Sequence, residues 1–267
     1  MASLPQPEKF DAEKGSRRFG WLLNGTEQDI HQIHGGCGFS KKLLHGFSQI
    51  TYCAARLQQE RESPIIPITA DYLLRQLQDL RQWNRESSDW DDVQSGPPVV
   101  EWVRAQPNGY EIDTDASMTD VTAEAWRLAT IIYLQCRALR LSRNHPDVVL
   151  NLDDLAKCIS ITPTSGQHFT AQAPLFPVFL LGILATVPEH EAVSIQWFEE
   201  VLETPVRSSV PPLYTALKHI WSWIDREIPL SLPHDPDISP SIHLRDPWWE
   251  TLVQHVLEQE QEVLCLT

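Results

Sequence analysis

The stretch TAQAPLFPVFLLGILATVPEH, residues 170–190, is the most apolar part of the chain. Its apolar run, residues 173–187, is 15 residues long, whereas a helix that crosses a membrane needs roughly 20. Pro174 and Pro177 fall in the first five positions of this run, where the start of a helix tolerates proline. No lysine or arginine occurs within 15 residues of either end, so the flanks lack the basic residues that orient membrane helices. We therefore predict a buried central helix near residues 175–187 and no membrane segment.

Helical patterns lie on both sides of this stretch. Residues 122–141 place apolar side chains on most sides of a helix, which is typical of a helix in the centre of a fold. Residues 67–84 show an apolar stripe with spacings of three and four, and Thr69 is the predicted N-cap of that helix. Ser40 is the predicted N-cap of another helix, and Pro188 fits the first position of a third.

The predicted fold class is all-α, because neither an alternating strand pattern nor an internal repeat is visible. We expect an irregular array of about eight to ten helices. Residues 1–18 are predicted to form a flexible N-terminal lead-in, and residues 19–267 a single all-α domain. Residues 85–120 are rich in turn-forming and acidic residues, so we predict a loop insertion there, with one short element near residues 99–104.

Composition argues against nucleic-acid binding and against a disulfide framework. The formal net charge is −15, and such a charge repels the phosphate backbone of nucleic acids. We therefore expect no direct nucleic-acid contact by this chain. The five cysteines are scattered at long intervals and are odd in number, which favours buried free thiols in a reducing compartment over a disulfide framework.

Two short patterns suggest catalytic or metal sites. The segment HGGCGFS, residues 34–40, resembles a glycine-rich oxyanion segment of esterases, but the run around Ser48 lacks the second glycine of a nucleophile elbow. The alternative interpretation is a turn before a helix. His31, His34 and Cys37 share a three-residue spacing that metal ligands can have, but a fourth ligand is not visible.

Two acidic pairs invite a different enzymatic interpretation. Asp91-Asp92 and Asp153-Asp154 could hold magnesium against a diphosphate, as in an all-α isoprenoid synthase. Neither pair extends to a third acid, and Lys157 stands where one would be needed. The alternative is a loop for the first pair and a solvated helix start for the second. We assign no catalytic, cofactor-binding or metal-binding residue, and we expect neither a cofactor nor enzymatic activity.

Six phrases in a fixed order carry a family resemblance. They are GCGFSKKLLHGFSQITYCAARL (36–57), PITADYLLRQLQDLRQW (67–83), TAEAWRLATIIYLQCRALRL (122–141), SGQHFTAQAPLFPVFLLGILAT (165–186), WFEEVLETPVRSSVPPLYTALKHIWSWID (197–225) and WWETLVQHVLEQEQEVLCLT (248–267). Together they resemble the C-terminal regulatory domain of fungal zinc-cluster (Zn2Cys6) transcription factors, in the branch of acriflavine-sensitivity-control proteins. The resemblance covers nearly the whole chain from about residue 19.

The resemblance implies an all-α regulatory domain, a nuclear location and a role in RNA polymerase II transcription. In such proteins, a separate module with six closely spaced cysteines around two zinc ions reads DNA. The nearest cysteines of this chain, Cys37 and Cys53, are 16 positions apart. We therefore expect this chain to lack its own zinc-cluster module.

Three functions follow as hypotheses. The first is an effector domain that acts through the transcription machinery or a regulator partner, as a homodimer or heterodimer, or through a small effector held among its helices. The second is a truncated relative that pairs with full-length regulators and inhibits them. The third is an all-α metabolic enzyme, which only the acidic pairs and the expected helical fold suggest.

Overall fold

The computed structural model describes residues 19–169, 174–204, 209–228, 230 and 242–260. These residues form eleven α-helices and one two-stranded hairpin, so the all-α prediction is confirmed. The elements in chain order are η2 (Gly20–Leu23), α2 (Glu27–His31), β1 (Ile33–His34), β2 (Phe39–Ser40), α3 (Lys41–Gln59), α4 (Ile65–Asp79), α5 (Trp90–Ser95), α6 (Val99–Ala105), α7 (Asp115–Arg137), α8 (Pro146–Ser160), α9 (Leu175–Leu184), α10 (Pro188–Leu202), α11 (Val210–Glu227), η4 (Ile242–Leu244) and α12 (Trp248–Glu260). The helix count exceeds eight to ten because helices as short as α2 and α5 give no periodic apolar pattern.

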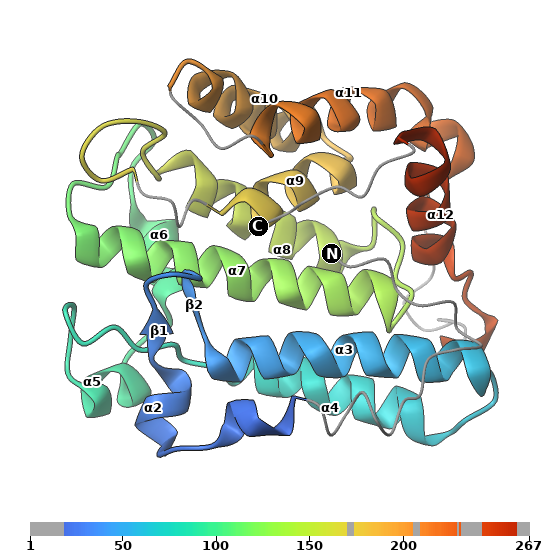
Figure 1. The fold of residues 1–267 in the computed structure, drawn as a ribbon, viewed down its shortest axis with the longest axis horizontal. Coiled ribbons are helices and arrows are strands. Elements are labelled where there is room, and N and C mark those ends of the chain that lie inside the picture. The colour runs from blue at the N-terminus through green and yellow to red at the C-terminus, as the bar shows by residue number, and fades with distance from the viewer. Residues whose placement is uncertain (1–18, 170–173, 205–208, 229, 231–241, 261–267) are drawn as a thin grey trace.

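Helix α7 runs through the middle of the molecule (Figure 1). Helices α3 and α4 pack on one side of it and α8 and α9 on the other, while α10 and α11 form an outer layer beyond α9. Every residue from Val121 to Arg137 except Trp126 is therefore buried. This confirms the prediction of a central helix from a sequence that is apolar on most sides.

The stretch that opened the sequence analysis forms the second central helix. All ten residues of α9 are buried, and the helix packs against α7, α8, α10 and α11. It ends at Leu184, three residues before the predicted end at 187, because Ala185 has a non-helical backbone. The helix is thus covered by protein, and no helix in the described residues has the length and hydrophobicity needed to span a bilayer.

Two predicted helix starts are confirmed and one is wrong. The Ser40 side chain accepts a backbone N–H from the first turn of α3, and Pro188 is the first residue of α10. Thr69, however, lies inside α4, where its hydroxyl donates to the carbonyl of Ile65 at 2.9 Å. The helix starts at Ile65 because Pro67 falls in the first turn, where a backbone N–H has no partner within the helix.

The predicted loop insertion at residues 85–120 is also corrected. The short element expected near residues 99–104 is α6, but the segment contains α5 as well, and α7 already begins at Asp115. Helix α5 has no buried residue, so its sequence carries no apolar stripe that could have revealed it.

One cluster of buried apolar residues extends from α3 to α12. The predicted lead-in, residues 1–18, and the terminal phrase EVLCLT lie outside the described residues.

Candidate functional site

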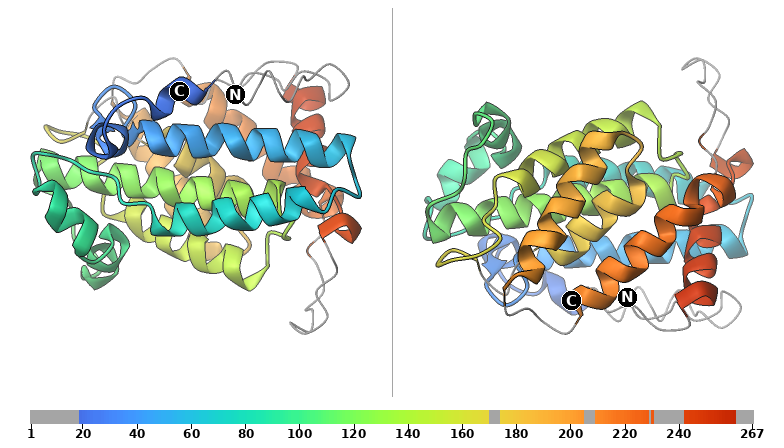
Figure 2. Two further views of the ribbon diagram at one scale, coloured as in Figure 1. Left: turned by 90° about the horizontal axis from the view of Figure 1, so that it is seen from below. Right: turned by 90° about the horizontal axis from the view of Figure 1, so that it is seen from above.

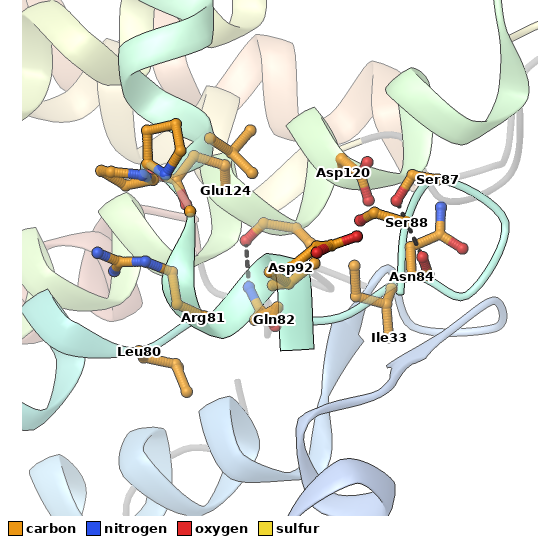
Figure 3. Close-up of a pocket in the computed structure, with 16 residues that line it drawn as sticks. Ile33, Leu80, Arg81, Gln82, Asn84, Ser87, Ser88, Asp92, Asp120 and Glu124 are labelled. Carbon is orange, nitrogen blue, oxygen red and sulfur yellow. Dashed lines mark hydrogen bonds between the residues drawn. The ribbon is translucent and has the colours of Figure 1, made fainter. Parts of the chain in front are cut away.

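A cavity of about 190 Å³ lies where the α4–α5 connection, the α5–α6 turn and the first half of α7 meet (Figure 3). Its apolar walls come from prolines and aliphatic side chains. Its polar lining includes Arg81, Gln82, Asn84, Asp92, Asp120 and Glu124. For comparison, an engineered apolar cavity of about 150 Å³ binds benzene, so this space can admit a small molecule of similar or slightly larger size.

The hairpin holds one wall of the cavity in place. The backbone N–H of Ile33 donates to the carbonyl of Trp83 at 2.8 Å, and the N–H of Trp83 donates to the carbonyl of His31 at 2.8 Å. The Trp83 indole N–H then donates to the carbonyl of Ser88 at 2.9 Å. These bonds fix the α4–α5 connection at both ends, although it has no regular secondary structure of its own.

Two amide side chains tie this connection to α7. Gln82 Nε2 donates to the carbonyl of Ala123 at 2.6 Å, and Gln82 Oε1 accepts the backbone N–H of Ser40 at 2.8 Å. Asn84 Nδ2 donates to the carbonyl of Ala116 at 3.3 Å. The cavity is therefore lined by side chains that are already held in place.

The α5–α6 turn closes the third side. The N–H of Gly96 donates to the carbonyl of Asp92 at 2.8 Å. A Cβ at position 96 would lie only 2.7 Å from that same oxygen, so only glycine fits without a shift of the backbone. Pro97 and Pro98 follow and restrict the chain as it enters α6.

The charges around the cavity are mainly negative. Three carboxylates, those of Asp92, Asp120 and Glu124, line it, against a single basic residue, Arg81. Glu124 is neutralised, because its two oxygens accept from Nε and Nη2 of the buried Arg127 at 2.9 and 2.6 Å. Burial opposes the charge of Arg127, but the charge and hydrogen bonds of Glu124 outweigh it and raise the pKa of the guanidinium.

Asp120 is the carboxylate whose proton affinity changes most. Partial burial raises its pKa to about 6, although hydrogen bonds from Ser87 and Asn84 favour the charged form. Above that pH, Asp120 and the exposed Asp92 offer acceptors to a ligand that donates hydrogen bonds or carries a positive charge. The arrangement can therefore bind a small polar ligand.

The patterns singled out in the N-terminal part of the sequence form no such site. Residues 34–40 are the hairpin and its turn, with Gly38 in the left-handed region at φ 75°, so the interpretation as a turn before a helix is confirmed. His31 Nδ1 and the Ser48 hydroxyl each bond a backbone carbonyl of their own helix. Cys37 lies exposed in the turn. Within the part of the chain that the structure describes, no three His, Cys, Asp or Glu side chains gather as a metal site requires.

The acidic pairs have separate places. The Asp154 carboxylate accepts from Nε and Nη2 of Arg104 at 2.7 and 2.6 Å, which joins α8 to α6. Its neighbour Asp153 bonds Nε2 of the buried His190 at 2.7 Å, which joins α8 to α10. Asp91-Asp92 lie in the first turn of α5, where Asp92 lines the cavity.

Sequence reasoning did not predict the cavity. Its lining comes from β1, from residues 80–99 and from α7, which are distant along the chain. Asp120 fell within the segment predicted as a loop. The one available signal was the polar pair Gln82 and Asn84 at the end of the patterned segment 67–84, which alone does not indicate a ligand site.

Comparisons with known proteins place this fold in a family. The model of the fungal specific transcription factor domain matches residues 3–262, which is almost the entire chain. No curated protein and no solved structure gives a significant match. Proteins with this domain function in transcription regulation, which is a nuclear role. The chain therefore belongs to the family of fungal specific transcription factor domains.

Proposed function

We propose that the chain is the regulatory or effector domain of a fungal RNA polymerase II transcription regulator, and that it acts through protein partners. The observation that carries this proposal is the family match over residues 3–262. The partner is a component of the transcription machinery or another regulator. A small effector bound in the cavity of Figure 3 is a second means by which the domain would be controlled.

The charge and the cysteines support a role that does not include direct DNA binding. A formal net charge of −15 repels phosphates, and no two cysteines are closer than 16 positions. The proposal is therefore that another chain or module carries the zinc cluster and brings this domain to a promoter. The assignment to the Zn2Cys6 class and to the acriflavine branch stays a prediction.

The proposed role does not involve catalysis. The enzyme alternative rested on the two acidic pairs and the helical fold, and both carboxylates of the pair Asp153-Asp154 already hold other helices through Arg104 and His190. A carboxylate engaged by a bidentate guanidinium is poorly placed to bind magnesium as well.

A tethering experiment tests the proposal. The chain is fused to a heterologous DNA-binding domain, and transcription of a reporter with the matching binding sites is measured in a fungal host. The DNA-binding domain alone, at equal nuclear abundance, is the control. We expect reporter transcription to rise or fall by several-fold. If a folded, nuclear fusion leaves the reporter at the control level and no nuclear protein co-purifies with it, the proposal is wrong.

The inhibitory alternative predicts a different result. A chain that only pairs with full-length relatives would leave the tethered reporter unchanged but would bind such a relative in a pull-down. Its expression would also lower transcription from a promoter that the relative controls.

A further inference from the structure

The cavity of Figure 3 lies at the edge of the molecule. Both views of Figure 2 show α5 and α6 at one end of the helical array, beside α7. Ser87, Asp92 and Pro97 line the cavity and are exposed, so a ligand can enter from solvent while every helix stays in place. Since a cavity of about 150 Å³ holds the six carbon atoms of benzene, a volume of about 190 Å³ fits a ligand of about six to eight non-hydrogen atoms.

The hydrogen-bond donors of the lining are largely engaged by the protein itself. The amide groups of Gln82 and Asn84 each donate to a backbone carbonyl of α7. Nη1 of Arg81 donates to the last two carbonyls of α4, at 3.4 and 3.3 Å. Figure 3 shows the Arg81 guanidinium directed away from Asp92 and Asp120. An anionic ligand would therefore meet these two carboxylates with few donors left to bind it.

The acceptors, in contrast, lack a positive partner. Glu124 is paired with Arg127, but no cationic side chain among the described residues forms an ion pair with Asp92 or Asp120. Partial burial without a counter-charge raises the pKa of Asp120 to about 6, so this carboxyl is still ionised at pH 7.5. A carboxylate that is partly removed from water gains most from a ligand that brings a positive charge to it.

The rest of the lining selects an organic cation over a metal ion. Leu80, Val93 and Val99 are among the aliphatic walls, which offer a metal ion no ligand but can cover the carbon atoms of an organic molecule. Within the described residues, no three His, Cys, Asp or Glu side chains gather here or elsewhere as a metal site requires.

We propose that this cavity binds a small organic cation, a protonated aliphatic amine whose ammonium group pairs with Asp120 and Asp92 and whose hydrocarbon body contacts the aliphatic walls. The inference deepens the proposed function, on which its regulatory meaning rests, because it names the chemical class of the small effector. A ligand of this size with one charged group has a dissociation constant of about 0.1–1 mM.

Isothermal titration calorimetry of the full chain at pH 7.5 tests the ligand class. The probes are cyclohexylamine, cyclohexanol and cyclohexanecarboxylate, which share a compact six-carbon ring and differ in charge. Cyclohexylamine is protonated at this pH, as a lysine amine is. We expect it to bind, cyclohexanol to bind at least about tenfold more weakly, and cyclohexanecarboxylate to give no measurable binding, because only the amine supplies the missing positive charge.

Nearly isosteric variants test the assigned residues. Asp120→Asn should weaken binding of cyclohexylamine at least about tenfold, and Asp92→Asn several-fold, because the second carboxylate is exposed and better screened. Asp91→Asn is the matched control, since it removes the same charge from the same turn of α5 but does not line the cavity. It should bind the amine like wild type. Thermal melts followed by circular dichroism establish that each variant is folded.

Four outcomes would overturn the proposal. They are cyclohexanol binding as tightly as cyclohexylamine, no detectable binding of the amine to wild type, a folded Asp120→Asn protein that binds it as wild type does, and MgCl2 binding more tightly than the amine. Because these titrations use the isolated chain, a failure to bind leaves a positive tethered reporter standing, and a silent reporter leaves measured binding standing.

Discussion

Replacing Gly182 by alanine in the central helix α9 should destabilise the protein, although alanine is the better helix former. The substitution gains about 1 kcal/mol of helix propensity. A Cβ at position 182, however, would lie 2.6 Å from the Ser194 hydroxyl and 2.7 and 3.1 Å from the two methyl carbons of Leu217. All three residues are buried where α9 meets α10 and α11, so little free volume is available to relieve the overlap.

The net effect follows from these opposing contributions. Overpacking by one methyl group costs about 1–3 kcal/mol. Moving the Ser194 hydroxyl also disturbs its hydrogen bond to the carbonyl of Val178, at 3.2 Å, which adds about 1 kcal/mol. After subtracting the propensity gain, we expect the free energy of unfolding to fall by about 2 kcal/mol, which corresponds to a decrease in Tm of about 4–8 °C.

Urea denaturation followed by circular dichroism measures this change. Gly46→Ala in α3 is the comparison, because its Cβ would meet a single side-chain carbon closer than 3.4 Å, Cδ2 of Leu77 at 3.2 Å. We expect its stability to stay within about 1 kcal/mol of wild type. In a Ser194→Ala background, the penalty for Gly182→Ala should shrink, since one of the two clashes is gone. A Gly182→Ala protein as stable as wild type would refute the close packing of α9 against α10 and α11.

Four further substitutions test other parts of the structure. Leu180→Asp should abolish the cooperative thermal transition in circular dichroism, because an unpaired buried charge costs several kcal/mol, which is a large part of the total stability of a domain. A melt like that of wild type would contradict the placement of α9. Asp120→Asn should stabilise the protein by about 1–2 kcal/mol at pH 8, because ionisation of a carboxyl with a pKa raised to about 6 disfavours the folded state. The gain should vanish below about pH 4, where the side chain at position 120 is neutral in both proteins. A gain that does not depend on pH would refute this. Arg104→Ala should lower the free energy of unfolding, measured by urea denaturation, by about 2 kcal/mol, because it leaves the buried carboxylate of Asp154 unpaired. Asp154→Ala should lower it by only about 1 kcal/mol, because the half-exposed guanidinium of Arg104 can turn to solvent. The reverse order would contradict the ion-pair geometry.

The sequence predicted the helices whose signals are local. Residues 122–141 and 175–187 were recognisable as central because their apolar residues occupy most of the helix circumference, and Phe179, Leu180 and Leu184 are buried as expected. The capping role of Ser40 was predictable for the same reason, since it depends on a few neighbouring residues.

The features that depend on distant segments could not be predicted. Asp154 gave no sign of its partner, because Arg104 lies fifty residues away. The cavity also escaped prediction, since three separate segments form it. The error at Thr69 had a further effect: with the N-cap predicted at Thr69 instead of Pro64, five residues late, the exposed Ile65 and Ile68 fell outside the predicted helix.

The tethered reporter, with wild type and Leu180→Asp compared at equal nuclear abundance, tests most directly whether the folded helical array regulates transcription. We predict that the wild-type fusion changes reporter transcription several-fold and that Leu180→Asp returns it to the level of the DNA-binding domain alone. Equal reporter transcription from the wild-type fusion, the Leu180→Asp fusion and the DNA-binding domain alone would contradict the account.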